Sequence, residues 1–117
     1  MAGTKAARVP QEDPADELQA KFVRGLSDPT RLRIVRYLLE GPRSVNEIVA
    51  HLNMAQNRVS NHLACLKWCG YVTTERRGRS VIYEVADERV RKLLDLTRRI
   101  VADNAQRIAT CVRIPER

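Results

Sequence analysis

QNRVSNHLACLKWCG, at residues 56–70, predicts one helix with two chemically different parts, ended by the glycine. The first turns carry side chains suited to DNA base edges, because Arg pairs with guanine and Asn or Gln with adenine. These candidates for DNA contact are Gln56, Asn57, Arg58, Ser60, Asn61 and His62. The last turns carry Cys65 and Cys69, which share one face because residues four apart lie above one another on a helix.

The residues just before this segment predict a helix-turn-helix. Ser44 and Glu47 have the spacing of a capping box, which would open a short helix ending near Leu52. Residues 53–55 then form a brief turn into the segment at 56–70. Two short helices joined in this way are typical of DNA-binding proteins, in which the second helix enters the major groove.

Two further helices are expected upstream. Apolar residues at four-residue spacing, Leu18, Phe22 and Leu26, predict a first helix over residues 14–27. Asp28-Pro29 then combines a good cap with a proline at the first helical position, so a second helix should start there and stop at residues 41–42.

After residue 70 the pattern changes to that of a β-hairpin. Residues 71–75 and 81–85 are rich in β-branched and aromatic side chains. The tip between them carries Arg76, Arg77 and Arg79. Such a tip could also be a plain solvated turn with no role in binding. Following a helix-turn-helix, three arginines favour a wing that contacts DNA phosphates or a groove, with affinity that weakens as salt rises.

A last helix should begin after Asp87 and keep its apolar stripe to about residue 109. The first and last helices are amphipathic and can pack against their copies in a twofold homodimer, which places two recognition helices one DNA turn apart. We therefore expect a mainly α fold with a small hairpin. Residues 1–13 should be a flexible tail, residues 14–109 a winged helix-turn-helix and dimerisation domain, and residues 110–117 a C-terminal tail carrying Cys111.

Length and composition agree with this interpretation. A chain of 117 residues suggests one domain, and 21 basic against 14 acidic residues give a net charge of +7. That charge favours double-stranded DNA as the partner, although charge alone also suits a membrane surface. No 18-residue apolar run and no signal-peptide core occur, so a cytoplasmic protein is expected. No acid/base pair, phosphate-cradling loop or activated nucleophile points to an enzyme.

Three stretches resemble the ArsR/SmtB family of dimeric winged-helix repressors: LSDPTRLRIVRYLLEG (26–41), VSNHLACLKWCGYV (59–72) and RRGRSVIYEV (76–85). The resemblance implies operator binding without effector and release when an effector binds. Two known effector sites of the family do not fit, because the helix SVNEIVAHL has no cysteine and the last helix has no histidine. The layout is similar to CmtR-like cadmium and lead sensors, which implies that Cys65, Cys69 and Cys111 bind the metal.

Three thiolates favour soft ions in trigonal or pyramidal sites, namely cadmium, lead or mercury. Zinc ranks lower because it normally takes four ligands, and As(III) is also a weaker candidate. His62 shares the face of Cys65 and is a lesser candidate ligand. Alternatives remain open: the cysteines could form a redox or reactive-sulfur switch, or could simply pack in the core of a constitutive DNA-binding protein.

Overall fold

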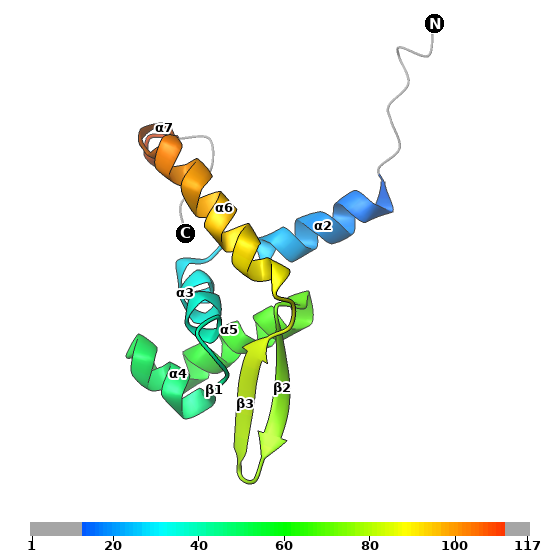
Figure 1. Cartoon of the computed structure of the whole chain (residues 1–117), viewed down its shortest axis with the longest axis vertical. Helices are drawn as coiled ribbons and strands as arrows, with labels where there is room; N and C mark the ends of the chain where they lie inside the picture. Colours follow the sequence, from blue (N-terminus) through cyan, green and yellow to red (C-terminus); the bar gives the residue numbers. More distant parts are fainter. Residues whose placement is uncertain (1–12, 112–117) are drawn as a thin grey trace, which may run out of the picture.

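The computed structural model describes residues 13–111, which form a mainly α winged helix-turn-helix, as predicted (Figure 1). In chain order the elements are α2 (Pro14–Arg24), α3 (Pro29–Leu38), β1 (Arg43–Ser44), α4 (Val45–Leu52), α5 (Gln56–Cys69), β2 (Val72–Arg77), β3 (Ser80–Val85), α6 (Arg89–Asp103) and α7 (Ala105–Ala109). The predicted tails lie outside the described residues, except that Asp13 caps α2 and residues 110–111 follow α7.

The core lies where α3, α4 and α5 meet, with the base of the hairpin and the start of α6 packed against them. Apolar residues of these helices recur at helical spacing, so each helix turns one face inward. The buried side chains are Ile34, Val35, Leu38, Ile48, Leu52, Val59, Leu63, Leu66, Tyr71, Val72, Val90 and Leu94. Of the described elements, α2 contributes no fully buried residue and projects from this body (Figure 1).

Side-chain caps fix the starts of α3 and α4 as the sequence predicts. The buried carboxylate of Asp28 accepts the backbone N–H groups of Thr30 and Arg31, at 2.7 and 3.2 Å. Ser44 and Glu47 form both bonds of the capping box. Asn53 follows α4 with a left-handed backbone, φ 53°, and turns the chain into α5 within three residues. The helix-turn-helix is thus confirmed in place.

The hairpin is longer than the sequence indicated. The strands β2 and β3 pair in antiparallel register from Val72↔Val85 to Arg77↔Ser80, so Arg76 and Arg77 lie in a strand and not in the turn. A third strand, β1, pairs with β3 on its other side. No local pattern predicted β1, because a two-residue strand exists only through its partner.

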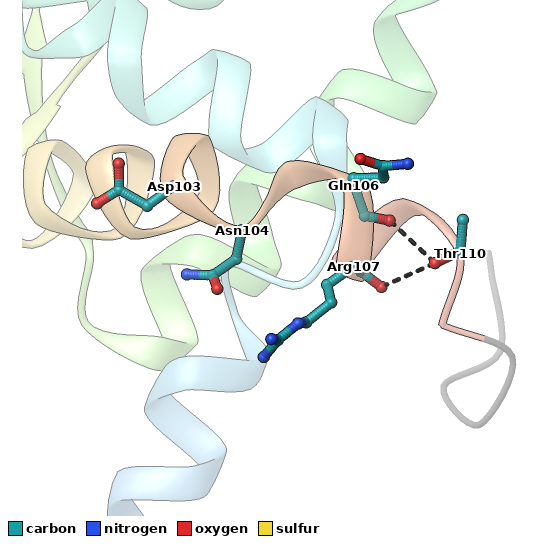
Figure 2. Close-up of a pocket in the computed structure, with 5 residues that line it drawn as sticks. All are labelled: Asp103, Asn104, Gln106, Arg107 and Thr110. Carbon is teal, nitrogen blue, oxygen red and sulfur yellow. Dashed lines mark hydrogen bonds between the residues drawn. The ribbon is translucent and has the colours of Figure 1, made fainter.

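The last helix is broken, whereas the apolar stripe predicted a continuous one. The chain leaves α6 at Asn104, whose side-chain amide donates to the carbonyl of Ile100 at 2.9 Å. The short α7 then ends where the Thr110 hydroxyl donates to the carbonyls of Gln106 and Arg107 (Figure 2). A polar hollow at this corner is lined by Asp103, Asn104, Gln106, Arg107 and Thr110. Cys111 is the next residue in the chain after Thr110.

Tyr71 joins three parts of the fold. Its backbone N–H donates to the carbonyl of Leu66, closing the end of α5 beyond Gly70, and its carbonyl accepts from Ala86 at the end of the hairpin. Its ring stacks on Phe22 of α2 at 4.1 Å between centroids, and its hydroxyl donates to the Phe22 carbonyl at 2.8 Å. Burial, with a smaller effect from Cys69, raises the pKa of Tyr71 to about 12, so the hydroxyl remains a donor.

Replacing Asp28 by Ala should lower the free energy of unfolding by about 1–2 kcal/mol, because two N–H groups at the start of α3 lose their acceptor. The pKa of Asp28 lies below its usual value in the folded protein. Its carboxylate therefore contributes stability above about pH 4, and this contribution is lost as the pH falls through the folded pKa. Urea unfolding of Asp28→Ala at pH 7 and pH 3 measures both effects.

The matched control is Asp103→Ala, which removes an exposed carboxylate near the end of α6. Equal losses of stability in the two variants at pH 7 would contradict a specific capping role for Asp28.

Candidate metal centre and nucleic-acid interface

Cys65 and Cys69 lie together on a half-buried face of α5, close enough for one thiol to affect the titration of the other. The Cys69 thiol also donates to the backbone carbonyl of Lys21 in α2, at 3.8 Å. Burial raises the pKa of the Cys69 thiol and the Cys65 thiol raises it further, while the charges of Arg31 and Lys21 oppose both. A metal ion binding here has to displace a proton.

Cys69 of the thiol pair lies against the end of α2. Gly25, just after α2, is buried, and a Cβ atom placed on it would lie 2.8 Å from Cε2 of Tyr71 and 3.1 Å from Sγ of Cys69. Arg31 of α3 donates its Nε to the Gly25 carbonyl at 2.7 Å and so holds this end of α2. An ion bound by the two thiols would therefore act on the contact between α2 and α5.

The third predicted ligand lies elsewhere in the same chain. Cys111 is exposed and follows α7, which Figure 1 shows at the far end of α6 from α5. With 15 residues, α6 is about 22 Å long. Within residues 13–111, no three His, Cys, Asp or Glu side chains lie close enough together to hold a metal ion. One chain thus brings together two of the three predicted thiols.

The predicted DNA-reading side chains differ in exposure. Five of them, from Gln56 to Asn61, are exposed on the first turns of α5. His62 is half-buried and lies close enough to Asp28 to affect its titration. Burial opposes the charge of Asp28, but hydrogen bonds from Arg31 and Thr30 and the charges of His62 and Arg31 hold the pKa of that carboxyl below its usual value. His62 is therefore directed partly towards the protein.

The arginines of the hairpin are exposed on the element that projects farthest from α2 and α6 (Figure 1). Arg77 forms an ion pair with Glu75 at 3.3 Å, which compensates part of its charge. Arg76 donates to the Gly78 carbonyl at 3.5 Å, across the turn. Arg79 occupies the turn itself, next to Gly78, whose φ is 62°.

Large apolar side chains remain exposed on α2 and α6. On α2 these residues are Leu18 and Val23, and on α6 they are Leu96, Ile100 and Val101. Trp68, one residue before Cys69, is 85% exposed and was not singled out by its spacing. In the described part of the chain, no helix is long and apolar enough to cross a membrane.

The helix-turn-helix followed by a β-hairpin defines a winged-helix DNA-binding protein. The sequence matches the bacterial regulatory protein arsR family over residues 28–74, from the cap of α3 into β2. It is 45% identical over 116 residues to the "probable mercury resistance operon repressor" of Streptomyces lividans, covering 98% of this chain and 91% of that protein. The chain therefore belongs to the arsR family of transcriptional regulators, and not to a family of enzymes.

Solved structures agree. A homodimeric winged helix-turn-helix DNA-binding domain from Mycobacterium bovis matches 85% of this chain and 94% of that one, with a TM-score of 0.70 and 29% identity. The cadmium metal-sensor CMTR from Mycobacterium tuberculosis matches 65% of this chain and 79% of that one, with a TM-score of 0.57 and 42% identity. Both share the fold described above.

Replacing Gly25 by Ala should lower the free energy of unfolding by about 1–3 kcal/mol, because the added methyl group forces Tyr71 and Cys69 away from α2. Urea unfolding of the variant beside Gln19→Ala, an exposed change in α2, measures this cost. Unchanged stability of Gly25→Ala would show that α2 moves freely relative to α5.

Proposed function

We propose that this protein is a metal-responsive repressor that binds operator DNA as a homodimer and releases it when a soft metal ion binds Cys65, Cys69 and Cys111. The observation that carries the proposal is the adjacency of two free thiols on α5, against the carbonyl of Lys21. Cadmium, lead and mercury are the expected ions, because thiolates select soft metals. The names of the relatives support this choice, since one is a mercury resistance repressor and another a cadmium sensor.

The proposed homodimer uses the exposed apolar faces of α2 and α6. Burying side chains such as Leu18 and Ile100 against a second copy removes apolar surface from water, the main driving force for association. The homodimeric relative from Mycobacterium bovis supports the same arrangement. In such a dimer, Cys111 of the partner subunit supplies the third thiol, which the length of α6 keeps away from the pair in its own chain.

The release mechanism follows from the position of the thiols. The DNA-reading side chains, proposed as Gln56, Asn57, Arg58, Ser60, Asn61 and, partly, His62, occupy the first turns of the same helix that carries Cys65 and Cys69. A metal ion would fix α5 to the end of α2 and to the partner's tail, and so change the spacing of the two recognition helices. By linkage, DNA must weaken metal binding by the same factor.

Titration of the reduced protein with Cd(II), Pb(II) and Hg(II) should produce strong thiolate-to-metal absorption bands that saturate at about one ion per subunit, because each site takes one ion and three thiols. The variants Cys65→Ser, Cys69→Ser and Cys111→Ser should each alter the bands. Ultraviolet absorption measures the binding, and the three ions can be ranked by competition.

The same variants separate sensing from DNA binding. Cys65→Ser should bind operator DNA as the parent protein does, but should no longer release it when metal is added. Release that persists in Cys65→Ser would refute the assignment of the site. Bands that are indifferent to all three substitutions would favour a thiol switch or a constitutive DNA-binding protein.

The wing should add affinity through phosphate contacts of Arg76, Arg77 and Arg79. Each contact contributes about 0.9 to the slope of log K against log salt. Arg79→Ala should therefore reduce the slope by about two units in the proposed homodimer, because each of its two subunits carries Arg79 in the turn at the tip of the hairpin. Arg77→Ala should have less effect, since Glu75 already compensates its charge.

Fluorescence anisotropy of labelled operator DNA at several salt concentrations measures the slope. Arg107→Ala, which removes a charge at the far corner between α6 and α7, is the control and should leave it unchanged (Figure 2). An unchanged slope in Arg79→Ala would mean that the wing points away from DNA.

A further inference from the structure

Arg31, in the first turn of α3, joins that helix to the end of α2. The residue is half-buried. Its guanidinium donates from Nε to the carbonyl of Gly25 at 2.7 Å and from Nη2 to the carbonyl of Arg24 at 3.4 Å. A helix leaves its last carbonyls without partners of its own, and a cation is favourable at that end. Arg31 therefore holds the last turn of α2 in place relative to α3.

The same end of α2 borders the proposed metal centre. The Cys69 thiol donates to the carbonyl of Lys21 at 3.8 Å, and a Cβ atom on Gly25 would lie 3.1 Å from its sulfur. Burial and the neighbouring Cys65 raise the pKa of the Cys69 thiol, whereas the charge of Arg31 lowers it. The guanidinium is thus close enough to attract the sulfur of Cys69 once the thiol has lost its proton.

A second contact of Arg31 leads towards the DNA-reading part of α5. Its backbone N–H donates to the buried carboxylate of Asp28 at 3.2 Å. Burial and the hydrogen bonds at the start of α3 have the larger effects on the pKa of Asp28, and the charge of His62 adds a smaller one, which places these two side chains near each other. Arg31 therefore contacts both the segment of α2 beside the thiols and the cap beside His62.

We propose that Arg31 is a positioning residue that couples metal binding at Cys65 and Cys69 to the orientation of the DNA-reading turns of α5. The inference rests on the metal-driven release put forward under the proposed function and deepens it. It names a side chain, outside the thiols and outside the DNA-reading set, on which the release depends.

Metal binding changes the interactions of Arg31. The thiol of Cys69 gives up its proton to water when it binds the ion, so its hydrogen bond to the Lys21 carbonyl is lost. Three thiolates around a divalent ion also leave a net negative charge, which attracts the guanidinium away from the carbonyl of Gly25. A ligand shifts a conformational equilibrium only through such differences in interaction between two states. The displacement of Arg31 then reaches His62 through the Asp28 cap.

The coupling factor of the full-length homodimer tests this role. It is the operator affinity without Cd(II) divided by the affinity with Cd(II), read from the fluorescence anisotropy of labelled DNA, and in the parent protein it should lie between about 5 and 150. Arg31→Met keeps a long side chain and a high helix propensity but removes the charge and the side-chain donors. We expect a factor of about two or less, while the thiolate-to-metal bands saturate as in the parent.

The ratio separates coupling from a structural role. A variant that has only lost stability binds the operator less well to the same extent with and without metal, so its factor stays that of the parent. Arg33→Met is the matched control, because Arg33 is exposed on the same helix. It should keep the factor of the parent. An unchanged factor in Arg31→Met, or an equal loss in Arg33→Met, overturns the proposal.

Arg31→Lys protects the test against a folding defect in Arg31→Met. Lysine keeps the charge and the helix propensity but lacks the planar fork that reaches two carbonyls at once. Its coupling factor should be no more than about half that of the parent. A folded Arg31→Lys protein with the full factor of the parent would refute the proposal.

Asp28→Asn tests the second contact. Asparagine can still cap α3, but it lacks the charge that lies near His62. Its coupling factor should also fall, and the full factor in this variant would overturn the route through His62. A parent protein that keeps its operator affinity in Cd(II) refutes the proposed function and this inference together. Release that is equal in the parent and in Arg31→Met refutes the inference alone.

Discussion

The arrangement of the whole molecule depends on the buried side chain of Tyr71. Its backbone closes the end of α5 and the base of the hairpin, while its ring and hydroxyl hold Phe22 of α2. A buried hydroxyl left without an acceptor is costly, so the Phe22 carbonyl fixes where α2 crosses the body. Because α2 contributes no fully buried residue of its own, this contact, the close packing at Gly25 and the hydrogen bond from Arg31 to the Gly25 carbonyl hold its end against the body.

Local sequence signals predicted most of the fold. The capping box at Ser44, the cap at Asp28 and the left-handed Gly70 each act within a few residues, so the helix-turn-helix could be placed before the structure was known. Features set by distant partners could not be predicted. The strand β1 exists only by pairing with β3, and the break at Asn104 interrupts a stripe that stays apolar on both sides. Tyr71 is an aromatic residue of the kind that is common in strands, so the sequence gave no sign that it would join α2, α5 and the hairpin.

For the candidate site too, features within one helix could be predicted from the sequence, whereas contacts between distant segments could not. Spacing on one helix was enough to bring Cys65 and Cys69 together, and polarity was enough to place the exposed side chains at the start of α5. Sequence could not reveal that Gly25 and Lys21 border the thiols, because these contacts join residues more than 40 positions apart. Nor could it show that His62 lies near Asp28, since that proximity depends on the packing of α3 against α5.

The exposure of Trp68 has a practical consequence. It is the single tryptophan of the sequence, it is in contact with water, and it is the residue next to Cys69. The near-ultraviolet emission of this protein therefore comes chiefly from one position, on the last turn of α5. Any heavy ion, tail or second subunit that reaches this end of the helix changes the surroundings of that indole. The unlabelled protein thus contains its own optical probe, at the junction on which its architecture depends.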